Sequence, residues 1–273
     1  MTEDDITAKL RRQAPLIGDD CAVISFNKSE DLLLKADMTV EGVHFTRESK
    51  ADQIGARAVA RSLSDIAAMG GTPLYCLISL ALAPWTDQRW IDKFYRGVFQ
   101  LLRKSDTALA GGDISHADQF VCDVMLCGSV AKGKALRRSG AHPGDALYVS
   151  GPLGGWRHKR AITPRLEFGR KLLGVATACM DISDGLALDL RRLCKASGVA
   201  AELDTVPLLD GATIEQALHD GEDYELLYSA PPRVKAPGIR IGSIVQGRAG
   251  VVRYQGKLLK PVGYDHIRER PAR

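Results

Sequence analysis

The stretch ADQIGARAVARSLSDIAAMGG, residues 51–71, decides the fold. At 100° per residue, its apolar side chains fall into two stripes on nearly opposite faces of a helix. One stripe holds Ala56, Val59, Ala60, Leu63, Ile66 and Ala67, and the other holds Ile54, Ala58, Ala68 and Met69. We therefore predict a buried helix from Asp52 to Met69 that ends at the glycine pair Gly70-Gly71.

Asp65 lies in the middle of the second stripe, where little water reaches. A buried carboxylate needs a partner, because without one it costs several kcal/mol or takes up a proton. Arg61, one turn earlier, offers an ion pair that would make Asp65 structural. A metal ion is the other interpretation. The helix alone favours the ion pair, and choosing between the two interpretations requires the rest of the sequence.

Composition limits the class of protein. The chain has 273 residues, 45% of them apolar and 26% charged, and no apolar run approaches the ~20 residues of a membrane span. With the polar start MTEDDITAKL, this predicts a cytoplasmic protein without a secretory signal. Basic residues are scattered, which argues against a nucleic-acid partner. The six cysteines lack zinc-site spacing and are expected in the reduced core.

Strand-like and helical segments alternate in the first half, which predicts a layered α/β fold. Expected strands end at Asp37 and cover 75–83, 107–111 and 120–131, and an amphipathic helix covers 85–104. The Gly- and Pro-rich junction RRSGAHPGD at 137–145 marks a boundary, so we predict domains at 1–137 and 138–273. In the second domain we expect strands at 145–151, 199–204 and 223–231 and helices at 164–173 and after Gly185.

Six acids stand at strand ends, beside glycines or inside the buried helix: Asp20, Asp37, Asp65, Asp113, Asp181 and Asp184. If the fold brings them together, two of them ~5 Å apart at an effective dielectric of ~20 repel by ~3 kcal/mol. Carboxylates without His or Cys ligands select Mg²⁺ or Mn²⁺, and Mg²⁺ held this way usually serves substrate phosphates. A Gly111-Gly112 turn, the glycine loop 151–155 and Arg138 are candidate phosphate ligands. The P-loop and protein-kinase signatures are absent from the sequence.

The motifs GDDCAV (18–23), ADMTVEGVHF (36–45), RSLSDIAAMGGTP (61–73), GGD (111–113), RRSGAHPGD (137–145), MDISDGLALDL (180–190) and GEDYEL (221–226) occur in this order. The chain thereby resembles the thiamine-monophosphate kinases, of the superfamily that includes aminoimidazole ribonucleotide synthetase. The resemblance implies a two-domain α/β fold of the α+β type, with mixed sheets flanked by helices. It also implies a homodimer joined through the N-terminal domains, and transfer of the ATP γ-phosphate to thiamine monophosphate.

The resemblance also implies roles for residues. The six aspartates would hold several Mg²⁺ ions. ATP would be contacted by Gly112, Asp113, Arg138 and Ser183. The thiamine phosphate would be contacted by His44, Glu222 and an aromatic residue, for which Tyr264 is the candidate. No side chain is implied as a catalytic acid or base. A phosphate monoester is already ionised at pH 7, so positioning and charge neutralisation suffice.

Two departures from the family pattern stand out. Lys35-Ala36 replaces two hydroxyl residues before Asp37, so that Lys35 either replaces a cation or points away. The connection 155–164 is much shorter than in the family. Both departures keep open a nucleotide-binding dimer without activity. A second alternative is another ATP-dependent enzyme of the superfamily.

Overall fold

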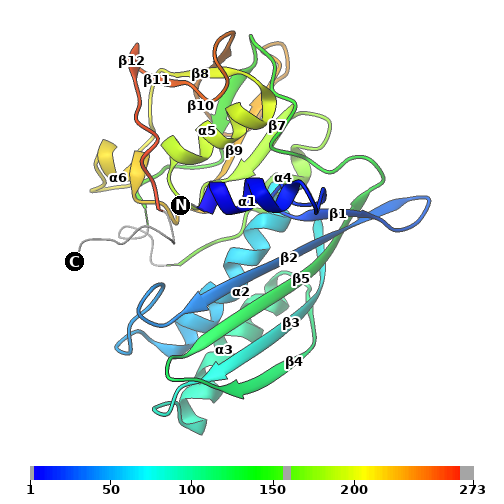
Figure 1. Cartoon of the computed structure of the whole chain (residues 1–273), viewed down its shortest axis with the longest axis vertical. Coiled ribbons are helices and arrows are strands. Elements are labelled where there is room, and N and C mark those ends of the chain that lie inside the picture. The colour runs from blue at the N-terminus through cyan, green and yellow to red at the C-terminus, as the bar shows by residue number, and fades with distance from the viewer. Residues whose placement is uncertain (1–2, 156–160, 265–273) are drawn as a thin grey trace.

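The computed structural model describes residues 3–155 and 161–264 and shows two mixed β-sheets with helices against them (Figure 1). This confirms the predicted fold class. Residues 156–160, half of the shortened connection 155–164, lie outside the described residues. No helix within the described ranges is long and apolar enough to cross a membrane.

The first sheet has the strand order β1-β2-β5-β3-β4 in the described part of the chain. Its strands are β1 (Ala22–Ser25), β2 (Glu30–Val40), β3 (Thr72–Leu82), β4 (Ala108–His116) and β5 (Val121–Ala131). Helix α3 (Gln88–Lys104), capped by the Asp87 side chain, links the parallel strands β3 and β4. The remaining neighbours are antiparallel. Helices α2 (Ala51–Ala68) and α3 cover one face, and Figure 1 shows them behind the sheet.

The second sheet has the order β12-β11-β8-β10-β6-β9-β7. Its strands are β6 (Ala146–Val149), β7 (Ala178–Asp181), β8 (Ala200–Leu203), β9 (Leu226–Ala230), β10 (Ile239–Val245), β11 (Val252–Tyr254) and β12 (Lys257–Leu258). Helices α4 (Leu166–Lys171), α5 (Leu186–Ser197) and α6 (Ile214–His219) belong to this half. The N-terminal helix α1 (Glu3–Arg11) joins it too, through ion pairs from Asp4 to Arg191 and Arg192. The division at 137/138 remains our proposed boundary.

Helix α2 is buried on two sides, as its apolar stripes predict. It packs on α3, β2 and β5 of the first half and on α4 and β7 of the second. In the contacts of α2 with α3 and with α4, the two helix backbones approach closely at a glycine. A Cβ on Gly97 of α3 would lie 1.8 Å from the Asp52 carbonyl oxygen, and one on Gly169 of α4 would lie 2.0 Å from that of Ala67. Because α2 contacts both sheets, it can position side chains between them.

Two predicted elements differ from the structure at functionally important residues. Strand β2 continues through Asp37 to Val40, since β5 pairs with it over its whole length. Strand β4 likewise runs through Gly111, Gly112 and Asp113, which pair with β3, so the predicted Gly111-Gly112 turn is wrong. In both cases the ladder of a neighbouring strand overrides the local turn propensity of Asp and Gly. The helices α3 and α4 are also a few residues shorter than predicted.

Candidate functional site

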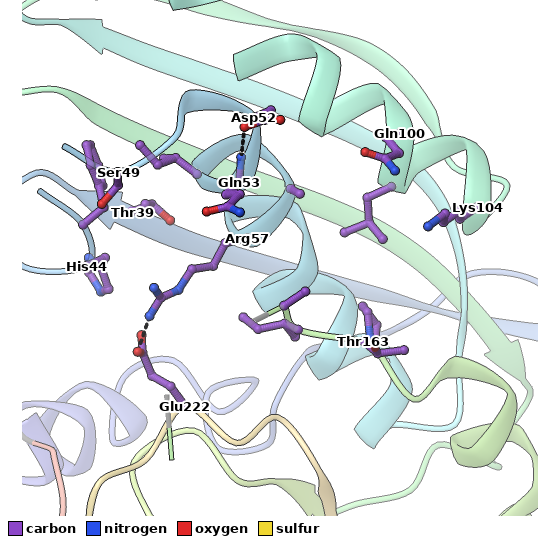
Figure 2. A pocket seen from close by; sticks show the side chains of 17 residues that line it. Thr39, His44, Ser49, Asp52, Gln53, Arg57, Gln100, Lys104, Thr163 and Glu222 are labelled. Atoms are coloured by element: carbon purple, nitrogen blue, oxygen red, sulfur yellow. Dashed lines mark hydrogen bonds and ion pairs between the residues drawn. The ribbon is translucent and has the colours of Figure 1, made fainter. Parts of the chain in front are cut away.

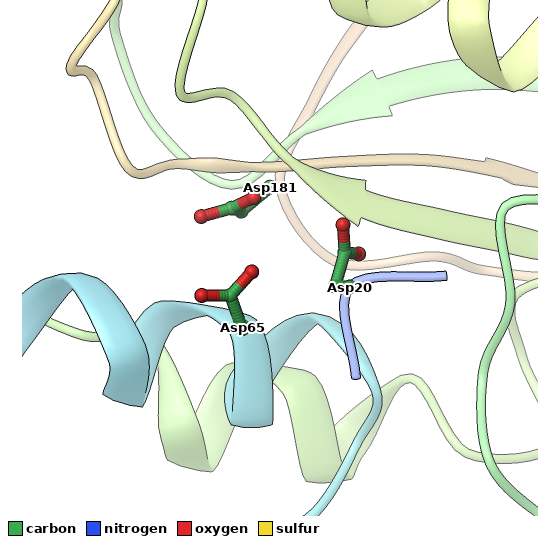
Figure 3. A group of neighbouring side chains, drawn as sticks. All are labelled: Asp20, Asp65 and Asp181. Carbon is green, nitrogen blue, oxygen red and sulfur yellow. The ribbon is translucent and has the colours of Figure 1, made fainter. Parts of the chain in front are cut away.

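Three aspartates from distant parts of the chain meet beside α2. Asp20 precedes β1, Asp65 lies on α2, and Asp181 ends β7. One carboxylate oxygen of each lies within 4.8 Å of the others, and all three residues are buried. Figure 3 shows their carboxylates turned toward one another. We call this group the acid cluster.

The acid cluster is electrostatically strained. Burial, with Asp37 and Asp20 nearby, raises the pKa of Asp65 to about 7, although Lys35 opposes the rise. Burial and the two neighbouring carboxylates raise the pKa of Asp181 well above its ordinary value, while a hydrogen bond from the Ser64 hydroxyl at 2.7 Å lowers it. Carboxyls that hold their protons this strongly mark a place where a cation would be accepted.

Asp20 is held by Arg138. The Arg138 Nε donates to Asp20 Oδ1 at 2.9 Å, and a guanidinium nitrogen pairs with the same oxygen. The other oxygen, Oδ2, is buried and has no hydrogen-bond partner among the described residues. A buried carboxylate oxygen with no partner is costly, so this atom is suited to a ligand that the protein itself does not supply.

The structure corrects the predicted partner of Asp65. The Lys35 ammonium lies 3.1 Å from Asp65 Oδ1, whereas Arg61 turns to Asp37 at 3.1 Å and to the Met38 carbonyl. The Arg61–Asp65 pair predicted from helical spacing is therefore wrong. The reason is tertiary: β2 runs beneath α2 and brings Lys35 and Asp37 on its helix-facing side within reach.

Asp184 lies outside the acid cluster and pairs with Arg192 of α5. Arg192 also binds Asp189 at 2.9 Å, and the second oxygen of Asp189 accepts the backbone N–H groups of Ser183 and Asp184. Asp189 thus shapes the loop after β7, a role that sequence reasoning missed. Its position inside the apolar run LALDL was the available signal.

Gly112 and Asp113 lie on the exposed edge strand β4. Four residues lie side by side across the first sheet, in the order Asp113, Ser79, Asp123 and Met38. Because paired residues point to the same face, all four share the sheet face opposite α2. Three strand spacings, about 14 Å, also separate β4 from β2. Within one chain Asp113 is therefore remote from the acid cluster.

Two amides of the glycine loop 151–155 are already bound inside the protein. The N–H groups of Gly154 and Gly155 both donate to Asp223 Oδ1 at 3.0 Å, so an internal carboxylate occupies the place predicted for a phosphate. Of the three predicted phosphate ligands, Arg138 is the one that the structure places against the acid cluster.

A cavity of about 410 Å³ lies between α2, α3 and the segment 161–164. Its lining includes His44 and Glu222, for which the family resemblance implies contacts with the same substrate. Arg57 of α2 projects into it and pairs with Glu222, as Figure 2 shows. Tyr264 does not line this cavity; its backbone N–H donates to the Asp184 carbonyl. The volume is in the range of small-molecule sites.

Helix α2 connects the cavity to the acid cluster. Arg57, Arg61 and Asp65 follow one another at four-residue intervals, along one line of the helix over about 12 Å. Arg61 Nε is buried without a hydrogen bond in the described part of the chain. Sequence reasoning missed Arg57, although its spacing from Asp65 was the signal.

Together the fold and the site define a two-sheet α/β protein whose cavity and enclosed carboxylates share one helix. Residues 18–130 match the family described as AIR synthase related protein, N-terminal domain. The thiamine-monophosphate kinase of Salmonella typhimurium is 34% identical over 249 residues, covering 79% of this chain and 76% of the relative. That of Aquifex aeolicus is 32% identical over 93% of this chain and 94% of its own.

The solved structure of AaThiL complexed with AMPPCP and TMP superimposes with a TM-score of 0.90, at 30% identity and 97% coverage of both chains. The chain belongs to the thiamine-monophosphate kinase family.

Proposed function

We propose that this chain transfers the γ-phosphate of ATP to thiamine monophosphate, giving thiamine diphosphate and ADP, in a magnesium-dependent reaction in the cytoplasm. The observation that carries the proposal is the pairing on α2 of a substrate-sized cavity with the acid cluster. Family membership supports the same reaction. The six cysteines, all free thiols, agree with a reducing compartment.

The residues present fit Mg²⁺. Their donors are carboxylate oxygens, three of them close together, and the buried Asp20 Oδ2 has no hydrogen bond among the described residues. Asp20, Asp65 and Asp181 would hold the ion or ions, with Asp37 and Asp184 as further ligands. When bound, Mg²⁺ neutralises charge on the transferring phosphate.

The chain's own side chains bind and orient the two substrates. His44 and Glu222 contact the thiamine part in the cavity, and Arg57 and Arg61 attract the acceptor phosphate along α2 toward the acid cluster. Arg138 and Ser183 contact ATP from the second half, as the family resemblance implies. A guanidinium is suited to this work, because its fixed donors match phosphate oxygens in pairs.

The transfer needs no catalytic base. An oxygen of the acceptor phosphate forms a bond to the γ-phosphorus while the bond to the bridging oxygen breaks, and ADP leaves with that electron pair. The acceptor's second pKa is about 6, so it is already ionised at neutral pH. Positioning and charge neutralisation by the protein then account for catalysis.

A homodimer through the first sheet completes the proposal. The sheet face opposite α2 exposes Met38, Tyr75 and Met125, at 52%, 56% and 38%, and no strand of the described residues pairs with the outer edge of β4. An open apolar sheet face with a free edge favours association with a second copy. Asp113 lies at this face, and Gly112 precedes it on the same edge strand, so they could serve ATP or metal only where the partner brings a site to them.

The test is direct. Purified chain is incubated with ATP, Mg²⁺ and thiamine monophosphate, and thiamine diphosphate is measured by chromatography. We expect product that requires all three additions and is abolished by excess EDTA. Nucleotide binding without product at high enzyme concentration would instead identify a nucleotide-binding protein that has lost the activity.

A further inference from the structure

Lys35 occupies an unusual place for a lysine. Side chains on β2 alternate, so Lys35 shares the face of the buried Leu33 and points beneath α2. Its ammonium lies 3.1 Å from Asp65 Oδ1, with the two side chains 27% and 8% exposed. It is therefore a half-buried cation in contact with one member of the acid cluster.

The surroundings keep Lys35 charged. A lysine ammonium is charged at neutral pH, and the ion pair with Asp65 favours the charged form. Lys35 thus contributes a permanent positive charge at a position that faces several carboxylates.

The cations of the acid cluster are unevenly distributed. Asp20 has Arg138 and Asp65 has Lys35, whereas the hydrogen bond to Asp181 comes from the neutral Ser64. A divalent ion that approached Asp65 Oδ1 would have to displace the ammonium and then remain beside it. Like charges at such distances repel strongly in a buried site. Arg138 binds Oδ1 of Asp20, so Asp20 Oδ2, which has no hydrogen bond among the described residues, is left for a divalent ion.

We propose that the Lys35 ammonium permanently fills one cation position of the acid cluster, so that this chain binds one divalent ion fewer than a variant with a neutral residue there. This inference rests on the metal site of the proposed function. It assigns Lys35 a positioning role: it holds Asp65 in place and directs the divalent ions toward Asp20 and Asp181.

The number of Mn²⁺ ions bound per chain is measured by electron paramagnetic resonance. The nonhydrolysable analogue AMPPCP replaces ATP, so that the result does not depend on turnover. Lys35→Thr and the longer, neutral Lys35→Gln should each bind one more Mn²⁺ than the wild type, and Lys35→Arg should match the wild type. Lys132→Thr is the matched control, since it removes another lysine–aspartate pair of the same sheet, Lys132–Asp31 at 2.9 Å.

The outcomes separate the two proposals. An equal Mn²⁺ count in wild type, Lys35→Thr and Lys35→Gln, each folded by circular dichroism, overturns the role of Lys35 and leaves the metal site standing. If none of these chains binds Mn²⁺, the metal site fails and Lys35 with it. A second measurement supports the same distinction: the rise in Tm on adding Mn²⁺ should be larger in Lys35→Gln than in the wild type.

Discussion

Asp65 is under two opposing influences. Lys35 favours its charged form, while burial and the carboxylates of Asp20 and Asp37 disfavour it. Because its pKa is raised overall, the charged form costs free energy in the metal-free fold. A residue that destabilises the fold it belongs to is typical of a functional site.

We expect Asp65→Asn to raise the metal-free Tm by about 2–4 °C, the shift that about 1 kcal/mol gives in a chain of this size. The same change should lower turnover more than about 100-fold, since it removes a metal ligand. Differential scanning calorimetry in EDTA and a product assay measure the two effects. Asp118→Asn, at an exposed loop position, is the control. A lower Tm with near-normal turnover would make Asp65 merely the partner of Lys35.

The pH dependence of metal-free stability follows from the same carboxyl. Folded Asp65 keeps its proton up to about pH 7, whereas the unfolded chain releases it near pH 4. Between these values the folded state binds more protons, so its stability falls as pH rises through this range. Thermal unfolding in EDTA from pH 4 to 8 should show this decline, and Asp65→Asn should reduce it. An identical slope in both proteins would contradict the assignment.

Glu222 pairs with Arg57 inside the cavity. If it contacts the thiamine part, Glu222→Gln removes a charge-assisted hydrogen bond that is made equally in ground and transition states. The KM for thiamine monophosphate should then rise about tenfold with little change in kcat. Steady-state kinetics measure this, and Glu202→Gln on the exposed side of β8 is the control. A loss confined to kcat would place Glu222 in the chemical step instead.

At the scale of elements, α2 organises the site because both halves of the chain pack on it. It carries Arg57, Arg61 and Asp65 past the cavity and the acid cluster, while β2 below and β7 beside it supply the other charges. The distance from α2 to its neighbours depends on glycines at which the backbones almost touch.

Gly97→Ala tests this close packing. Alanine favours a helix by about 1 kcal/mol over glycine, but its Cβ would lie 1.8 Å from the Asp52 carbonyl oxygen, so α3 must move. We expect a net loss of about 1–3 kcal/mol in unfolding free energy, as for other overpacked cores. Urea unfolding measures it, with the exposed Arg96→Ala on α3 as control. Unchanged stability would show that the helices have room to separate.

At the scale of the molecule, the open face of the first sheet predicts association. The chain should sediment as a dimer, and Met125→Lys should shift it to the monomer, because it places a charge in the middle of an apolar interface. Analytical ultracentrifugation decides this. Leu258→Lys, which alters an exposed apolar residue of β12 instead, should leave the dimer intact. A monomeric wild type would remove the proposed interface.

Local physical chemistry was enough to predict the α/β class, the buried helix and the special position of Asp65. Periodicity of 3.6 or 2 residues reports which side chains are buried, whatever they pack against. The same reasoning grouped Asp20 and Asp181 with Asp65, because acids after strands and glycines gather at sheet ends, but it placed Asp37, Asp113 and Asp184 in the same group.

Only the tertiary structure decided which charges meet. The partner of Asp65 proved to be Lys35 and not Arg61, the GGD segment proved to be a strand, and Asp113 proved to lie on the opposite face. These outcomes depend on strand pairing and on how β2 passes under α2. Such contacts join residues far apart in the chain. An ion pair forms with the nearest opposite charge in space, and the spacing of residues along one helix does not reveal which charge that is.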